Sequence, residues 1–153
     1  MGHGATIEWR RGDQAFVDNK YSRAHVRRFD GGAEVAGSSS PLSVPLPYSD
    51  PAAVDPEEAM VASLSSCHML WFLAFAAKAG WVVDRYLDAA SGELDRDEAG
   101  RRYLARVALR PVTTFLGEAP SQAELDALHH QAHDHCDMAH SVRSTITIAA
   151  SVG

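Results

Sequence analysis

With 153 residues, of which 46% are hydrophobic and 22% charged, the chain has the length and composition of a soluble globular protein with its own core. A formal net charge of −6 argues against a nucleic-acid partner. Neither an internal repeat nor a linker divides the sequence, so we predict a single domain, 1–153. The N-terminus lacks the layout of a secretory signal, and we therefore expect a cytoplasmic protein, in which the two cysteines are reactive or metal-binding.

The first third of the chain is predicted to form three short strands and a long loop. Residues 5–11, 21–29 and 33–37 have strand character, and the sequence DGG at 30–32 is a strong hairpin signal between the last two. Four prolines within residues 38–55 exclude a helix and a central strand there. A loop of this length in a small domain is typically functional or packed over another element.

Residues 55–80, DPEEAMVASLSSCHMLWFLAFAAKAG, are predicted to form the helix around which the chain is organised. Asp55 and Glu58 have the spacing of a capping box, and Gly80 is typical of a helix end. No charged residue lies between Glu58 and Lys78, and a helix that is apolar all round is either buried or membrane-spanning. The serines, cysteine and histidine within the run favour a buried central helix and no membrane span.

Two strands, a helix and a final strand are predicted to follow. Residues 81–94 and 101–112 are expected to pair as a hairpin through a polar link. A second helix begins at Ser121 and carries Cys136 on its apolar face near its end. Apolar residues alternate in the last strand, 142–148. Three strands, a helix, two strands, a helix and a strand form an α+β pattern.

Cys67 and Cys136 are the only cysteines, and each is predicted to lie on an apolar helix. One interpretation makes both of them small buried core residues, as free cysteines often are. The other makes them a peroxidatic and resolving pair. In that case one thiolate attacks a peroxide oxygen, becomes a sulfenic acid and is captured by the second thiol. Spacing alone leaves both interpretations open.

The histidines offer a rival site. Eight occur in the chain, and the segment HHQAHDHC, residues 129–136, concentrates four of them beside a cysteine. His129 and His133 have the i,i+4 spacing that can bind zinc, and Cys136 could supply a sulfur ligand. The alternative is a solvated polar helix face, since a histidine-rich tract is only a compositional indication of metal binding.

Two segments resemble the cysteine motifs of the OsmC/Ohr family, the osmotically induced and organic-hydroperoxide-resistance proteins. Residues 55–80 resemble the first motif, and AHDHCDMAHSVRSTITI, residues 132–148, resembles the second. The resemblance covers most of the chain, and the order of elements agrees. It implies an α+β fold in which antiparallel strands from two chains wrap two buried central helices as an intertwined homodimer.

The resemblance also implies an activity and the residues that perform it. Family members similar to Ohr and OsmC are thiol-dependent peroxidases that reduce organic hydroperoxides with two cysteines, an arginine and a glutamate. Carried over to this sequence, Cys67 is the nucleophile, Cys136 resolves its sulfenic acid as a disulfide, and Glu57 is the glutamate. No bound cofactor is implied. A dithiol or lipoyl-type small molecule is expected to reduce the disulfide.

The arginine is carried over less directly, because residues 10–25 do not match the family pattern cleanly. Arg23 is the first choice, and Arg10 and Arg11 are the alternatives. The chain also has Asp137 directly after the second cysteine, where Ohr proteins have a proline. These departures indicate an OsmC-like branch. The competing functions are a binding module for a small apolar ligand in the dimer cleft and a zinc protein that uses the histidine tract.

Spacing along the central helix predicts how the site is assembled. Glu57 and Cys67 are ten residues apart, so in one straight helix their backbones lie ~15 Å apart along the axis and ~80° apart around it. No proline or glycine lies between them to break the helix. We therefore expect Glu57 to serve the Cys67 site of the partner chain.

Overall fold

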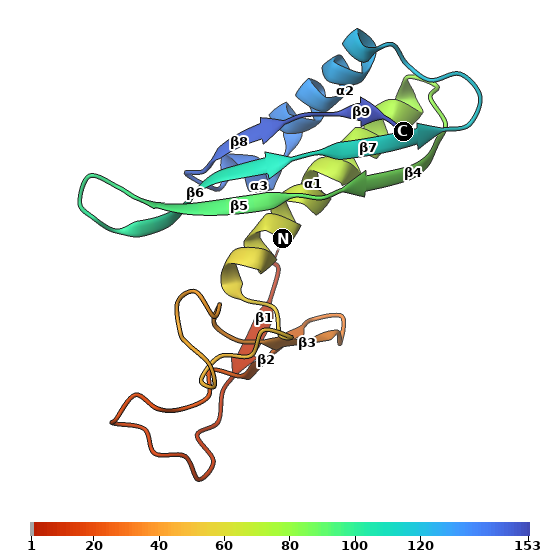
Figure 1. The fold of residues 1–153 in the computed structure, drawn as a ribbon. Helices are drawn as coiled ribbons and strands as arrows, with labels where there is room; N and C mark the ends of the chain where they lie inside the picture. Colours follow the sequence, from red (N-terminus) through yellow and green to blue (C-terminus); the bar gives the residue numbers. More distant parts are fainter. Residues whose placement is uncertain (1) are drawn as a thin grey trace. The chain divides into compact units, whose positions relative to one another are not determined.

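The computed structural model describes residues 2–153 as a mixed α+β fold with antiparallel strands and a central helix, as the sequence predicts (Figure 1). The chain forms two compact units, Met1–Ala59 and Met60–Gly153. Helix α1, Pro56–Lys78, begins at the end of the first unit and contributes most of its length to the second.

The first unit contains an antiparallel sheet with the strand order β1-β2-β3. Its strands are β1 (Ala5–Glu8), β2 (His25–Phe29) and β3 (Glu34–Gly37). The predicted hairpin joins β2 to β3, and Gly32 takes the positive φ of 88° that its turn requires. The strands predicted at 5–11 and 21–29 are shorter than expected, because the residues between them turn repeatedly rather than pair.

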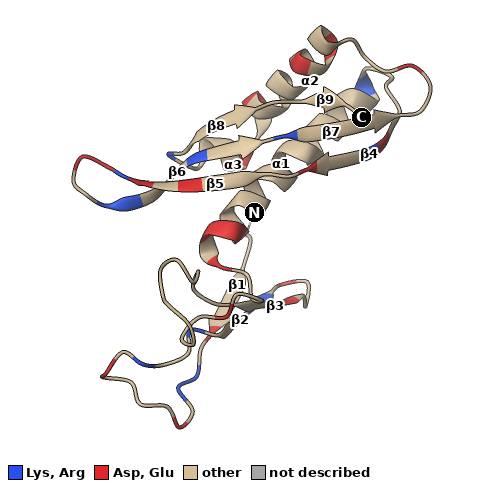
Figure 2. Ribbon diagram, viewed as in Figure 1, with Lys and Arg blue, Asp and Glu red and all other residues tan. Residues whose placement is uncertain are grey.

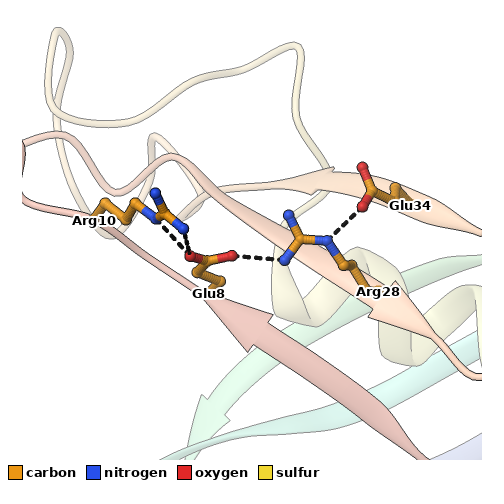
Figure 3. A network of polar contacts seen from close by, with 4 residues as sticks. All are labelled: Glu8, Arg10, Arg28 and Glu34. Atoms are coloured by element: carbon orange, nitrogen blue, oxygen red, sulfur yellow. Dashed lines mark hydrogen bonds and ion pairs between the residues drawn. The ribbon is translucent and has the colours of Figure 1, made fainter.

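An ion-pair network crosses the three strands of this sheet (Figure 3). Glu8 on β1 accepts hydrogen bonds from Arg10 and from Arg28 on β2, where the Nη1–Oε2 distance is 2.6 Å. Arg28 also donates to Glu34 on β3. The bond from Arg28 is the main reason that the pKa of Glu8 is lowered. Because all four side chains are solvated, the network favours the strand register and adds little stability.

The proline-rich loop, residues 38–55, folds back onto its own sheet. It contains turns but no helix, as predicted, and its single bridge joins Gly37 to Val54. The buried Ser38 accepts a hydrogen bond from the Asp50 amide at 3.0 Å. The loop therefore ends at a defined position immediately before α1.

Both predicted ends of α1 are confirmed by their capping bonds. The Asp55 carboxylate accepts from the Glu58 amide at 2.7 Å, and Glu58 accepts from the Asp55 amide at 3.0 Å. At the other end Gly80 has a φ of 87° and bonds to Ala77, while Trp81 bonds to Ala76, which is a Schellman motif. The helix between these caps is uninterrupted, as expected.

Burial of α1 within one chain is one-sided, although its middle carries no charge (Figure 2). The buried side is a single i,i+4 stripe: Leu64, His68, Phe72 and Ala76. A second, largely apolar stripe is exposed: Ala62, Ser66, Leu70 and Ala74. Among the residues that the structure describes, α1 is the one helix long and apolar enough to cross a membrane, a test that core helices of soluble proteins also pass. One chain thus supplies core packing for only one face of its central helix.

The long hairpin predicted for the second unit is present, but each of its two arms is interrupted near Asp88 and Arg110, so that it forms four strands. These are β4 (Val83–Asp88), β5 (Ser91–Arg96), β6 (Arg102–Leu109) and β7 (Pro111–Phe115). The division occurs where the Asp88 carboxylate accepts the backbone N–H of Arg110 at 2.7 Å, so this amide does not join the sheet ladder. The pairs β4·β7 and β5·β6 are antiparallel.

The C-terminal elements complete two three-stranded sheets, β4-β7-β9 and β5-β6-β8. These elements are α2 (Gln122–His135), α3 (Asp137–His140), β8 (Thr145–Ile148) and β9 (Ser151–Val152). The predicted capping box of α2 is present at Ser121 and Glu124. Strands β8 and β9 run parallel to β6 and β7, which places α2 against the second half of α1 (Figure 1).

Candidate functional site

The two cysteines are neighbours in the second unit. Cys67 lies in the middle of α1 and is partly exposed, whereas Cys136 lies at the end of α2 and is 1% exposed. Both cysteines are free, and the Cys67 side chain lies within hydrogen-bonding reach of Cys136. Burial raises the pKa of Cys136 to about 11, and the bond to Cys67 adds to this shift. Cys136 is therefore protonated at neutral pH.

A sharp change of backbone direction positions Cys136. It ends α2 and is the N-cap of α3, with an extended conformation (φ −74°, ψ 105°) between the two helices. Its sulfur accepts a hydrogen bond from the Ala139 amide at 3.4 Å. The thiol is thus held at a helix junction with its sulfur turned toward α1. The two neighbouring free thiols are chemically able to form a disulfide.

Two buried histidines join the helices that carry the thiols, and sequence reasoning did not pair them. His68 follows Cys67 on α1, and its Nε2 is 2.9 Å from Nδ1 of His129 on α2. Their exposed fractions are 1% and 2%. The pKa of each is lowered to about 4, mainly because burial disfavours the charged imidazolium. No local pattern signals this pair, since the two positions are 61 residues apart.

The histidine tract is therefore not uniformly a solvated helix face. The structure overturns that interpretation for His129, which is buried, and supports it for His130, which is exposed and lies 3.4 Å from Asp134. Within residues 2–153, no three His, Cys, Asp or Glu side chains are grouped to hold a metal ion. One nitrogen of His129 is already engaged by His68, so the zinc interpretation lacks a ligand set.

The candidate arginines all belong to the first unit. Arg23 donates to the Asn19 side chain at 2.8 Å and to the Tyr21 carbonyl, and its guanidinium lies 3.8 Å from the centre of the Tyr21 ring. Arg10 pairs with Glu8, and Arg11 donates to the Gln14 carbonyl at 2.7 Å.

No hydrogen bond or ion pair joins Arg23 to Glu57 within one chain, among its described residues. Glu57 is in the first turn of α1. Because α1 continues without a break to Cys67, the ~15 Å axial separation of these two residues applies to the structure. A site that uses both residues therefore requires a second chain or a different conformation.

Sequence reasoning also missed Arg27, a buried arginine on β2. It is 9% exposed and donates from Nη2 to the Val54 carbonyl at 3.0 Å, just before α1 begins. A buried guanidinium is costly unless it is well bonded, so such arginines are candidates for functional roles. The strand pattern around Arg27 did not distinguish it from Arg28, its solvated neighbour.

The comparisons with known proteins agree with this architecture. Residues 49–151 match the family model described as OsmC-like protein. A solved OsmC-like protein of unknown function from Vibrio cholerae O1 biovar eltor is 44% identical, with a TM-score of 0.93, over 100% of this chain and 99% of that one. A comparison with the curated proteins gives no match.

Two more distant structures share the fold. An organic hydroperoxide resistance protein from Elizabethkingia anophelis is 19% identical, with a TM-score of 0.72, over 100% of this chain and 96% of that chain. The organic hydroperoxide resistance protein OhrB of Bacillus subtilis is 14% identical, with a TM-score of 0.61, over 100% and 98%.

Proposed function

Because the chain belongs to the OsmC-like family, we propose that it is a thiol-dependent peroxidase that reduces organic hydroperoxides. The observation that carries this proposal is the contact between the Cys67 and Cys136 thiols. Solved proteins named for organic hydroperoxide resistance share the fold and lend support to this substrate class.

The proposed cycle has three balanced steps. The Cys67 thiolate attacks one peroxide oxygen of ROOH, the O–O bond breaks, and the leaving alkoxide takes a proton to give ROH and a Cys67 sulfenic acid. The Cys136 sulfur then attacks the Cys67 sulfur, which releases water and forms the disulfide. An external dithiol exchanges with this disulfide, becomes oxidised itself and restores both thiols.

Exposure and protonation support these two roles. Cys67 is partly exposed, so a dissolved peroxide can reach its sulfur. Cys136 is buried, and its raised pKa keeps it as a thiol, which is a poor first nucleophile. After Cys67 is oxidised, the contact between the two sulfurs favours attack by Cys136 over reaction with a second peroxide.

The remaining parts of the site are proposed to come from two chains. Arg23 orients the peroxide and favours the thiolate, and Glu57 of the partner chain holds this arginine by a charge-assisted hydrogen bond. The exposed apolar stripe of α1, which includes Leu70, is the surface that a homodimer would cover. Arg10 and Arg11 remain the alternatives to Arg23, and Arg27, which is buried just before the start of α1, is a further one.

The proposal includes the cellular setting expected from the sequence. The protein works in the cytoplasm without a bound metal, flavin or haem, and a dithiol or lipoyl-type molecule reduces it. The substrate is a small organic hydroperoxide rather than a nucleic acid or a membrane.

The test measures both thiols after oxidation. One equivalent of cumene hydroperoxide should consume both thiols of the wild-type protein and form one intrachain disulfide, detected by mass spectrometry. Cys67→Ser should lose turnover with a dithiol donor by roughly a thousandfold or more, because it removes the attacking atom. Cys136→Ser should react once and accumulate sulfenic acid or higher oxides.

Intact thiols after excess peroxide would contradict the enzyme proposal. That outcome would favour the binding-module alternative, in which the same residues line a site for an apolar ligand.

A further inference from the structure

The buried histidine pair joins the two helices that carry the thiols. On α1, His68 comes directly after Cys67, so their backbones differ by about 1.5 Å along the helix axis. On α2, His129 precedes Cys136 by seven residues, about two helical turns, and lies on the same face. The bond between the histidines and the contact between the thiols therefore connect the same two helices, α1 and α2, at two places along their length.

The rest of this helix contact is apolar and non-directional. Phe72 and Ala76 of α1 pack with Leu125, Leu128 and Ala132 of α2. The His129 ring also stacks on Phe72, with centroids 4.2 Å apart and planes 14° apart. Apolar packing stabilises contact but tolerates small sliding and rotation, whereas a hydrogen bond constrains both distance and angle.

The histidine pair is not expected to increase the stability of this core. Each imidazole leaves one buried ring nitrogen without a partner among the described residues, Nδ1 of His68 and Nε2 of His129. Such unpaired polar atoms lower stability, and apolar side chains of similar volume would often stabilise a core more. A hydrogen bond at this position, in spite of its cost in stability, therefore indicates that it fixes how α1 and α2 are placed relative to each other.

We propose that the His68–His129 hydrogen bond is a positioning contact that holds Cys67 and Cys136 in the alignment needed to form their disulfide. The proposal rests on the proposed function only in giving that disulfide a catalytic use. A disulfide requires a Cβ–Cβ distance of roughly 3.5–4.5 Å, so a shift of α2 along α1 by about one ångström would move the sulfurs out of range. The hydrogen bond tolerates a similarly narrow range of distances.

The experiment measures how readily the thiol pair closes, independently of peroxide. Wild-type, His68→Leu, His129→Leu and the double Leu variant are equilibrated with reduced and oxidised glutathione, and the effective concentration of the Cys67–Cys136 pair is calculated. Leu128→Ala is the matched control, because it loosens the same helix contact and leaves the hydrogen bond intact. Circular dichroism and urea unfolding establish that each variant is folded.

Each single Leu variant should lower the effective concentration roughly fivefold to tenfold, the effect of one buried hydrogen bond. The double variant should fall no further, because the bond is already lost, while its stability toward urea is unchanged or higher. Leu128→Ala should lose stability but change the effective concentration less than twofold. A single-turnover reaction of cumene hydroperoxide with Cys67 in a Cys136→Ser background should be insensitive to His129→Leu.

If the Leu variants fold and their effective concentrations equal that of the wild-type protein, the positioning role is wrong, whatever the peroxidase activity. If a Leu variant does not fold, His129→Gln serves instead, because a shorter amide that cannot reproduce the imidazole geometry should also lower the value. If the Leu variants lower the effective concentration as predicted but the wild-type protein does not reduce cumene hydroperoxide, the proposed function is wrong and the positioning role stands. A wild-type chain that forms no disulfide with glutathione would overturn both.

Discussion

Among single residues, the two cysteines differ in environment rather than in type. Cys67 is reachable from solvent, and Cys136 is buried at the junction of α2 and α3 with a raised pKa. Identical side chains thereby become suited to different steps in the proposed cycle, because burial disfavours the Cys136 thiolate whereas Cys67 is accessible to a dissolved peroxide. His68 and His129 are a second residue-level feature, since both are buried as neutral rings at pH 7.

The histidine pair predicts how stability depends on pH. In the unfolded chain both rings bind protons near pH 6.5, whereas burial lowers the folded pKa of each to about 4. The unfolded state therefore binds more protons as the pH falls from 6.5 to 4, and the free energy of unfolding should decrease over this window. The loss should amount to a few kcal/mol, because each tenfold difference in proton affinity between the two states corresponds to about 1.4 kcal/mol.

Urea unfolding at fixed protein concentration from pH 4 to 8 checks this expectation. The His68→Leu/His129→Leu variant should lose much of the slope between pH 4 and 6.5. His130→Asn, a change at an exposed position, should keep it. An unchanged slope in the double variant would assign the pH dependence to other groups.

Among the elements, α1 determines which residues can share a site. Its capping box and Schellman motif define both ends, and no kink lies between Glu57 and Cys67. Since a straight helix separates these residues by ~15 Å, the carboxylate and the thiol of one chain would serve different sites in the proposed homodimer. The continuity of α1 is thus the structural basis for proposing sites composed from two chains.

Subunit complementation tests this consequence. Glu57→Ala and Cys67→Ser chains, each confirmed to be inactive alone, are mixed after partial unfolding and are then refolded. Heterodimers should regain activity, because one site in each combines the Cys67 of one chain with the Glu57 of the other. About half of the dimers are mixed at equal input and each has one intact site of two, so roughly a quarter of wild-type activity is expected.

A mixture as inactive as its components would show that the site lies within one chain. Cys67→Ser mixed with Cys136→Ser is the comparison, because the contacting thiols belong to one chain and no combination restores both.

In the molecule as a whole, α1 presents an apolar face that one chain does not cover. Leu70 is 63% exposed in the middle of this face, and the neighbouring exposed positions on the same stripe are small residues. Exposed apolar stripes of this kind usually mark a contact with another molecule. The proposed homodimer would bury this stripe.

Leu70→Glu should disrupt that association. A charge placed in an apolar contact between two copies is repelled by its symmetry mate and loses hydration, so the dimer should weaken by at least about a hundredfold. Sedimentation velocity of the wild-type and variant proteins checks the assembly. Leu116→Glu, which changes an equally apolar and exposed residue outside α1, should sediment as the wild type does. A Leu70→Glu protein that stays dimeric would place the interface elsewhere.

The features that could be predicted from the amino-acid sequence are the local ones. Caps at Asp55, Gly80 and Ser121, the turn at 30–32, and the placement of Cys67 on a helix and of Cys136 at a helix end were all predictable. Each depends on side chains within a few residues of one another, so the signal is present in a short window. The motif resemblance extended this to the family and to the α+β fold.

Which distant groups meet depends on tertiary packing. The contact of Cys67 with Cys136, the burial of His129 against His68 and the burial of Arg27 each join positions far apart in the chain. The tract around His129 has the composition of a solvated face, and local composition cannot tell which of its histidines the packing of α2 on α1 turns inward. The division of the long hairpin at Asp88 and Arg110 has the same origin, because a side chain from one strand takes the backbone N–H of the other only after the two have paired.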